Sequence, residues 1–503
     1  MSSLEEAITS KANIRDPDDE ALVNDKCPTK CESAKAWSWK IKLLVLSVAF
    51  ICGAFTQYEA AAPCLFAFYG LYLTLIYKES RIWVQWGMTV ALAMSMMIAS
   101  GMVVRGLTWR RAETSYAIAF GIGLALMHVA FLAASVHMRL NARWKHWGLF
   151  FVFPAILAGF YVIMGHFTPF GTQLSPGYDL IDWLSFVQIV SLLGLSGLNF
   201  TIFSLCALLV HHYVIERPGS RLSRTAGYLA VGIFVFTWTY GSIRLVAPYM
   251  YQKGVGDLAP RPQDLLRGAC VVQAGGQTVE VLQQNAPDFI IWSESAGGFS
   301  EDDAPRFQSM ANESNAALAV TVGNRLVFFE PGQNVPLVRF TKGNPAPFME
   351  RGVSKGDPMA FGRSAVIGDF NAAICFDFDN PEYIRSGVNS GLMLQPANVG
   401  GVAGIYAQVP AIFRAIENGA TLVRCASKAV SGVWDPYGRA QLSTMRNTAD
   451  VIPFQIPKRH VQIWTFYHNV GFVFDYMLIV LMGASLILFA YTFWRPKPPS
   501  AEL

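Results

Sequence analysis

The stretch SAVIGDFNAAICFDFDNPEY, residues 364–383, joins an apolar run to a single cysteine and then turns acidic. The apolar run predicts a strand with a buried face, which Cys375 closes. Acidic neighbours raise the pKa of a thiol unless a nearby cation offsets them. Cys375 is therefore either a buried structural cysteine, the common fate of a free thiol, or a nucleophile with a cation beside it.

Two further reactive side chains follow apolar runs in the same part of the chain. Glu294 follows the run in DFIIWSES (288–295), and Lys342 follows the run in VPLVRFTKGNPAPFMERG (335–352). Taken singly, Glu294 could equally be a solvated residue at the end of a strand. Lys342, taken singly, fits an ordinary surface lysine. Their joint occurrence with Cys375 favours a shared site.

The sequence has no histidine between His212 and His460, so a cysteine nucleophile here cannot take its base from imidazole. A desolvated Glu294 could instead accept the thiol proton as general base. The Lys342 ammonium could stabilise the thiolate and then an oxyanion, with the backbone N–H of Phe376 as second donor. This chemistry predicts a thioester acyl-enzyme that water or an amine releases.

The region that carries these residues, 255–465, alternates short apolar runs with Gly, Pro and Asn, and includes helical patterns such as 408–419. Strands interleaved with helices predict a layered α/β domain. The predicted strands lie near 269–274, 287–292, 317–323, 335–341, 364–376, 391–397 and 421–427.

Outside this region the composition is that of a membrane protein, because 53% of all residues are hydrophobic and only 15% are charged. We expect seven membrane-spanning helices in 41–250 and one more at 469–493. The first two could instead form a re-entrant pair. The predicted spans lie near 41–56, 58–77, 82–104, 115–138, 147–166, 186–212, 226–247 and 469–493.

The positive residues beside these runs predict the orientation in the membrane. Most fall on one side if the polar tail 1–40 and the tail 494–503 are both cytoplasmic. The composition of the tail 1–40 predicts disorder. Arg105, Arg110 and Arg111 do not fit. The predicted catalytic domain then lies on the extracytoplasmic or luminal side. The supporting residues are Lys26, Lys30, Lys35, Lys40, Lys42, Lys78, Arg81, Arg139, Arg143, Lys145, Arg217, Arg221, Arg224, Arg495 and Lys497.

The eight cysteines show no metal-binding spacing, and we expect neither a metal nor a cofactor. Three lie in the predicted outer domain: Cys270, Cys375 and Cys425. An odd number in an oxidising compartment leaves at least one thiol unpaired. The net charge of +4 is small and does not indicate nucleic-acid binding.

In this order, Glu294, Lys342 and Cys375 resemble the Glu–Lys–Cys triad of the carbon–nitrogen hydrolase (nitrilase) superfamily. Glu350 stands eight residues after Lys342, where that family has a second carboxylate that supports the lysine. The segment FRAIENGATLVRCASKAVSGVWDPYG, 413–438, also resembles the family's segment after the nucleophile. The resemblance implies an inserted αββα sandwich in a multi-span α-helical membrane protein.

Seven spans, such a domain and a final span together resemble the apolipoprotein N-acyltransferases. That resemblance implies a phospholipid acyl donor and an amine-bearing acceptor, a lipoprotein or a small molecule. A membrane-anchored amidase acting on a small amide would use the same triad. A transporter or receptor is disfavoured, because the predicted spans carry few charges of the kind that mark transport paths.

The sequence departs from the acyltransferase pattern near the predicted site. The family's aromatic loop is replaced by 398–402, Asn-Val-Gly-Gly-Val. Phe376 stands where a tyrosine is usual, and Asp377 replaces a glutamate. We expect the altered loop to determine the acceptor.

Overall fold

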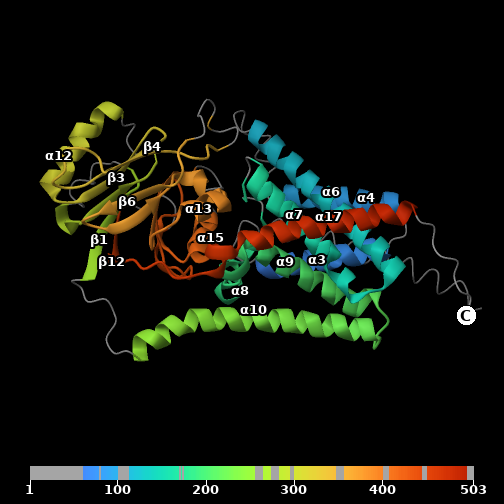
Figure 1. Ribbon diagram of the computed structural model, residues 1–503. Coiled ribbons are helices and arrows are strands. Elements are labelled where there is room, and N and C mark those ends of the chain that lie inside the picture. Colours follow the sequence, from blue (N-terminus) through green and yellow to red (C-terminus); the bar gives the residue numbers. More distant parts are fainter. Residues whose placement is uncertain are drawn as a thin grey trace, which may run out of the picture.

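The structure is a computed structural model, and a helical bundle lies at one end of it and an α/β domain at the other (Figure 1). The residues that it describes are 61–78, 81–99, 113–168, 171–172, 175–254, 264–273, 283–294, 300–346, 350, 356–399, 407–444 and 450–494. The predicted first span, 41–56, and most of the altered loop, 400–402, lie outside these residues.

In the part of the chain that the structure describes, seven long helices form the bundle, and they stand where the hydropathy of the sequence predicts helical runs. Among the described residues, five segments are long and apolar enough to cross a membrane: Leu124–Trp144, Trp147–Phe167, Val190–Ile215, Arg221–Val246 and Phe472–Trp494. The helices are α3 (Ala61–Lys78), α4 (Ile82–Ala99), α6 (Glu113–Trp144), α7 (Val152–Phe167), α9 (Val190–Val210), α10 (Arg221–Gly254) and α17 (Phe472–Trp494).

Helix α9 lies in the middle of the bundle and is buried along almost its whole length. Helix α10 runs along one side and exposes many large apolar side chains, among them Phe234 and Trp238 (Figure 1). Exposed apolar surface of this extent on a helix suits contact with hydrocarbon rather than water.

The α/β domain consists of two six-stranded sheets with parallel central strands and antiparallel edges. The first sheet has the order β12-β1-β2-β3-β4-β5, with β1 (Leu265–Val271), β2 (Phe289–Trp292), β3 (Ala317–Val322), β4 (Arg325–Phe329), β5 (Val338–Thr341) and β12 (Val451–Pro457). The second has the order β11-β10-β9-β8-β7-β6, with β6 (Ala360–Ser364), β7 (Gly368–Ala372), β8 (Leu392–Asn398), β9 (Thr421–Ser427), β10 (Gly432–Trp434) and β11 (Ala440–Ser443).

The two sheets pack face to face around an aromatic and aliphatic core. The rings of Phe328 on β4 and Phe370 on β7 have centroids 4.4 Å apart. A disulfide between Cys270 on β1 and Cys425 on β9 joins the sheets covalently across this core. The odd count of cysteines is thereby resolved, since the third cysteine of the domain, Cys375, is free.

Helices cover the outer faces of both sheets, which gives the expected αββα order of layers. Helix α12 (Ala304–Ser314) packs on the first sheet through Phe307 and Ala311. Helices α13 (Pro381–Gly387) and α15 (Val409–Asn418) cover the second sheet. These two helices also contact α7 and α9, so the second helical layer lies between the sheets and the bundle (Figure 1).

Candidate active site

Cys375 lies at the beginning of a 3-10 turn, η6 (Cys375–Asp379), just after β7. The predicted strand 364–376 is therefore wrong at both ends. Ser364 ends β6 and β7 begins at Gly368, whereas pairing stops at Ala372 and the cysteine begins the turn. The backbone of Cys375 has a φ of +47°. Such a conformation is uncommon for a residue with a Cβ, and residues held in it cluster at functional sites.

The turn is fixed by side chains from two other segments. The Asp377 carboxylate accepts hydrogen bonds from the backbone N–H of Ile374 at 2.8 Å and of Asn344 at 2.6 Å. Gln395 on β8 donates its side-chain amide to the carbonyl oxygen of Cys375 at 2.9 Å. Asp377 therefore ties the nucleophile turn to the loop that follows Lys342.

Lys342 lies just after β5 and is 1% exposed, which makes it a buried ammonium rather than a surface lysine. Its Nζ donates to Glu294 Oε1 at 2.9 Å and to Glu350 Oε1 at 2.6 Å. Burial alone would lower the pKa of Lys342, but Cys375, Glu294 and Glu350 raise it above its usual value. The lysine thus stays charged in the interior because two carboxylates pair with it.

Glu294 follows β2 by two residues and is 5% exposed. Its second oxygen, Oε2, accepts the backbone N–H of Asn398 at the end of β8, 3.1 Å away. Glu350 is half-buried, and its Oε2 accepts the backbone N–H of Ala346 at 2.5 Å. Glu294 therefore bonds both Lys342, after a strand of the first sheet, and the backbone of Asn398 on β8 of the second sheet, and both glutamates pair with Lys342.

The resting thiol of Cys375 is protonated. Burial and the Glu294 charge raise its pKa to about 12, although Lys342, Arg424 and a hydrogen bond with the backbone of Asn398 lower it. A nucleophilic role for Cys375 would therefore require transfer of the thiol proton to a base. Glu294 is the carboxylate whose charge acts most strongly on this thiol.

Arg424 on β9 was not predicted as part of the site. It is 1% exposed, and its Nη1 donates to Gln395 Oε1 at 2.6 Å. Since Gln395 donates in turn to the Cys375 carbonyl, a buried cation reaches the nucleophile through one amide. The sequence signal was an arginine inside the apolar run 421–427, where a charged side chain is rarely buried without a partner.

The altered loop begins beside the nucleophile. Val399 and Cys375 both pack against a small apolar cluster of Ala397, Ala426 and Ala429. Phe376 is the second residue of the 3-10 turn and is buried. N–H groups in the first turn of a helix have no partner within it.

No metal site accompanies these residues in the part of the chain that the structure describes. There, no group of three or more His, Cys, Asp or Glu side chains could hold a metal ion.

Comparisons with known proteins give matches to solved structures only. No protein-family model matches the chain, and no curated protein matches it. A CN-hydrolase superfamily protein from Xanthomonas campestris is 17% identical over 38% of this chain and 90% of its own, with a TM-score of 0.32. An amidase from Nesterenkonia sp. AN1 is 16% identical over 41% of this chain and 92% of its own, with a TM-score of 0.30.

Proposed function

We propose that this protein is a membrane N-acyltransferase of the carbon–nitrogen hydrolase type, which moves an acyl chain from a phospholipid through a Cys375 thioester to an amine. The observation that carries the proposal is the buried cluster of Lys342 with Glu294 and Glu350, in which the Glu294 and Lys342 charges act on the thiol of the free Cys375. A buried ammonium held by two carboxylates is costly to maintain. Its position beside Cys375 suits stabilisation of negative charge during acyl transfer.

In the first half-reaction, the Cys375 sulfur attacks the ester carbonyl carbon while its proton passes to Glu294. The Lys342 ammonium and the N–H of Phe376 stabilise the oxyanion. Collapse breaks the ester C–O bond, and the lysophospholipid oxygen leaves with the proton from Glu294. Cys375 now carries the acyl chain as a thioester.

In the second half-reaction, a neutral amine attacks the thioester carbonyl and Glu294 accepts a proton from it. The C–S bond then breaks and the sulfur recovers a proton, which leaves an amide product. Water in place of the amine would release a fatty acid. The same site would hydrolyse a small amide if its first substrate were an amide instead of a phospholipid ester.

Two observations support a lipid donor and an extracytoplasmic or luminal site. The helical layer over the second sheet rests on a bundle with five segments of membrane-spanning length. The Cys270–Cys425 disulfide is typical of oxidising compartments rather than the cytosol. We therefore place both termini in the cytoplasm and the α/β domain on the opposite side.

The test is to incubate the purified full-length protein with a phospholipid labelled in its acyl chain and to map the label by mass spectrometry. We expect a thioester on Cys375 that is discharged by an added amine and is absent in Cys375→Ala. Cys206, a free cysteine buried in α9, serves as internal control and should stay unlabelled. Absence of a thioester together with ammonia release from simple amides would contradict acyl transfer and identify an amidase.

A further inference from the structure

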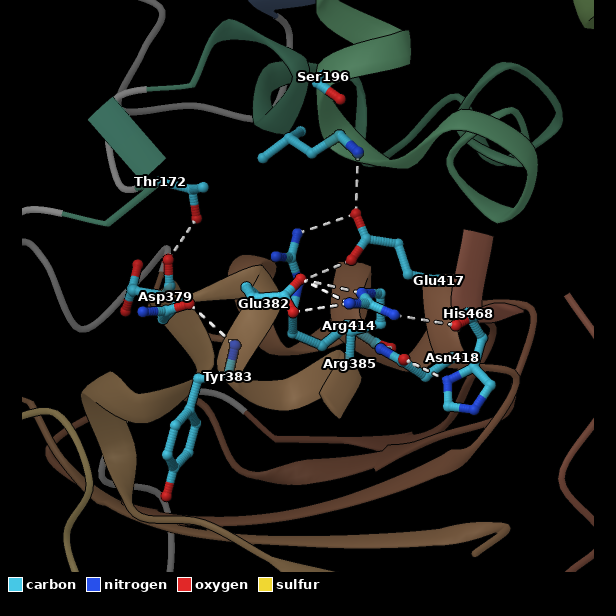
Figure 2. A network of polar contacts seen from close by, with 12 residues as sticks. Thr172, Ser196, Asp379, Glu382, Tyr383, Arg385, Arg414, Glu417, Asn418 and His468 are labelled. Atoms are coloured by element: carbon cyan, nitrogen blue, oxygen red, sulfur yellow. Dashed lines mark hydrogen bonds and ion pairs between the residues drawn. The ribbon is translucent and has the colours of Figure 1, made fainter. Parts of the chain in front are cut away.

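The helical bundle contacts the α/β domain at two polar places, one part-buried and one buried (Figure 2). At one, Thr172, from the segment between α7 and the 3-10 turn η2 (Pro176–Leu180), points at Asp379. At the other, Glu417 of α15 accepts the backbone N–H of Leu195 at 2.9 Å. That N–H follows Gly194, whose φ of +68° interrupts the helical path of α9.

Thr172 makes two hydrogen bonds to Asp379. Both the backbone N–H and the hydroxyl of Thr172 donate to the carbonyl oxygen of Asp379, each at 2.9 Å. Because a threonine hydroxyl has one hydrogen, the hydroxyl of Tyr178, 2.6 Å away, must donate to Thr172. The ring of Tyr178 packs edge-on against Phe413 of α15, with centroids 4.9 Å apart. Tyr178, which donates to Thr172, is therefore itself in contact with the α/β domain.

Gly171 allows this close approach. It has a φ of +59°, and a Cβ at this position would lie 2.6 Å from the carbonyl oxygen of Asp379. Any side chain here would strain the backbone and push the segment away from the turn.

Asp379 is the last residue of the five-residue turn that begins with Cys375. A 3-10 turn rises about 2 Å per residue, so the contact lies roughly 8 Å along the turn from the nucleophile. Asp377 and Gln395 hold the beginning of the turn from within the α/β domain. Thr172 holds its end from the bundle.

We propose that Gly171 and Thr172 are positioning residues, through which the membrane bundle sets the placement of the Cys375 thiol. The inference rests on the proposed function only in taking Cys375 as the nucleophile. Thr172 acts through the Asp379 carbonyl and does not touch the reacting atoms. The bundle is then part of the catalytic apparatus as well as an anchor.

The test uses the full-length protein in lipid nanodiscs and follows alkylation of Cys375 by iodoacetamide across pH 7–10, read by mass spectrometry of the Cys375 peptide. Loss of one buried hydrogen bond is worth about 1 kcal/mol, or roughly fivefold. We expect Thr172→Val to slow alkylation by about that factor. Gly171→Ala should slow it further, whereas Thr172→Ser, which keeps the hydroxyl, should restore the rate. With an acyl donor that forms a thioester, kcat should fall and KM should stay constant.

Thr225→Val is the matched control, because its hydroxyl bonds only within the exposed start of α10, to Arg221. It should alkylate as the unchanged protein does. Wild-type alkylation rates in Thr172→Val and Gly171→Ala, accompanied only by a lower melting temperature, would overturn the positioning role. If no phospholipid acylates Cys375 but alkylation still responds to Thr172, the proposed function fails and the positioning role stands.

Discussion

Glu294 and Lys342 act on the pKa of the Cys375 thiol in opposite directions: the glutamate raises it and the lysine lowers it. Glu294→Gln removes a negative charge, so we expect the thiol pKa to fall and alkylation of Cys375 at pH 8 to become faster. Acyl transfer should nevertheless fall by about 10²–10⁴, because the general base is lost. The measurement is the pH profile of alkylation beside single-turnover kinetics of thioester formation.

Lys342→Met is the counterpart of this variant. It should raise the thiol pKa and slow both alkylation and acyl transfer. If Glu294→Gln raised the thiol pKa, or left acyl transfer intact, Glu294 would not be the base.

At the scale of single residues, the sequence was sufficient to predict the site residues that end or follow apolar runs. It was insufficient to predict a site residue that lies inside such a run. Glu294, Lys342 and Cys375 were predicted as one site because each follows such a run, and the structure brings them together with Glu350. Their chemical roles stay predictions. Arg424 escaped prediction because its contact with Gln395 depends on the register between β8 and β9, which composition does not determine.

The turn η6 carries a buried carboxyl, Asp379, from which we expect a pH-dependent contribution to the stability of the fold. Burial raises the pKa of Asp379 from 3.8 to about 7, although Arg414 and Arg424 oppose the shift. A carboxyl whose pKa is higher in the folded than in the unfolded state stabilises the fold below pH 4 and loses that contribution as pH rises through 7. We expect Asp379→Asn to remove this loss, so that the variant gains thermal stability relative to the unchanged protein between pH 5 and pH 8.

The measurement is the difference in melting temperature between the two proteins across that range. Asp369→Asn, which replaces an exposed carboxylate of β7, is the control for the exchange of a carboxylate for an amide outside the core. If the difference in melting temperature between Asp379→Asn and the unchanged protein were the same at every pH in this range, Asp379 would stay ionised in the folded state.

Helices and strands were predictable from the sequence where one physical pattern dominates. Hydropathy predicted the helices of the bundle, because a helix that crosses hydrocarbon must be apolar along its whole length. It could not predict the interruption of α9 at Gly194, since Glu417, which accepts the freed N–H, lies 222 residues away in sequence. The end of the strand before Cys375 was likewise misplaced, because the apolar run continues into the turn.

For the whole molecule, the α/β class followed from alternating strands and helices, and the αββα order of layers was what the resemblance to the carbon–nitrogen hydrolases implied. The count of three cysteines predicted an unpaired thiol. Which two cysteines pair depends on how the sheets face each other, which sequence patterns do not contain. Cys270 and Cys425 lie on strands of different sheets, with 155 residues between them in sequence. Their bond closes a loop that contains Glu294, Lys342 and Cys375.

We therefore expect the disulfide to stabilise the domain and, with it, the site. Loss of a native disulfide costs about 2–5 kcal/mol, most for long loops in the chain-entropy model. Cys270→Ala with Cys425→Ala should lower the melting temperature and weaken acyl transfer, because Arg424 neighbours Cys425 on β9. Cys206→Ala removes a buried cysteine that forms no disulfide and serves as control.

A reductant such as TCEP should leave the folded protein unchanged, since both sulfurs are buried. It should reduce the disulfide only once heating separates the sheets. Reduction of the native protein at room temperature without loss of stability would show that the bond does not hold the sheets together.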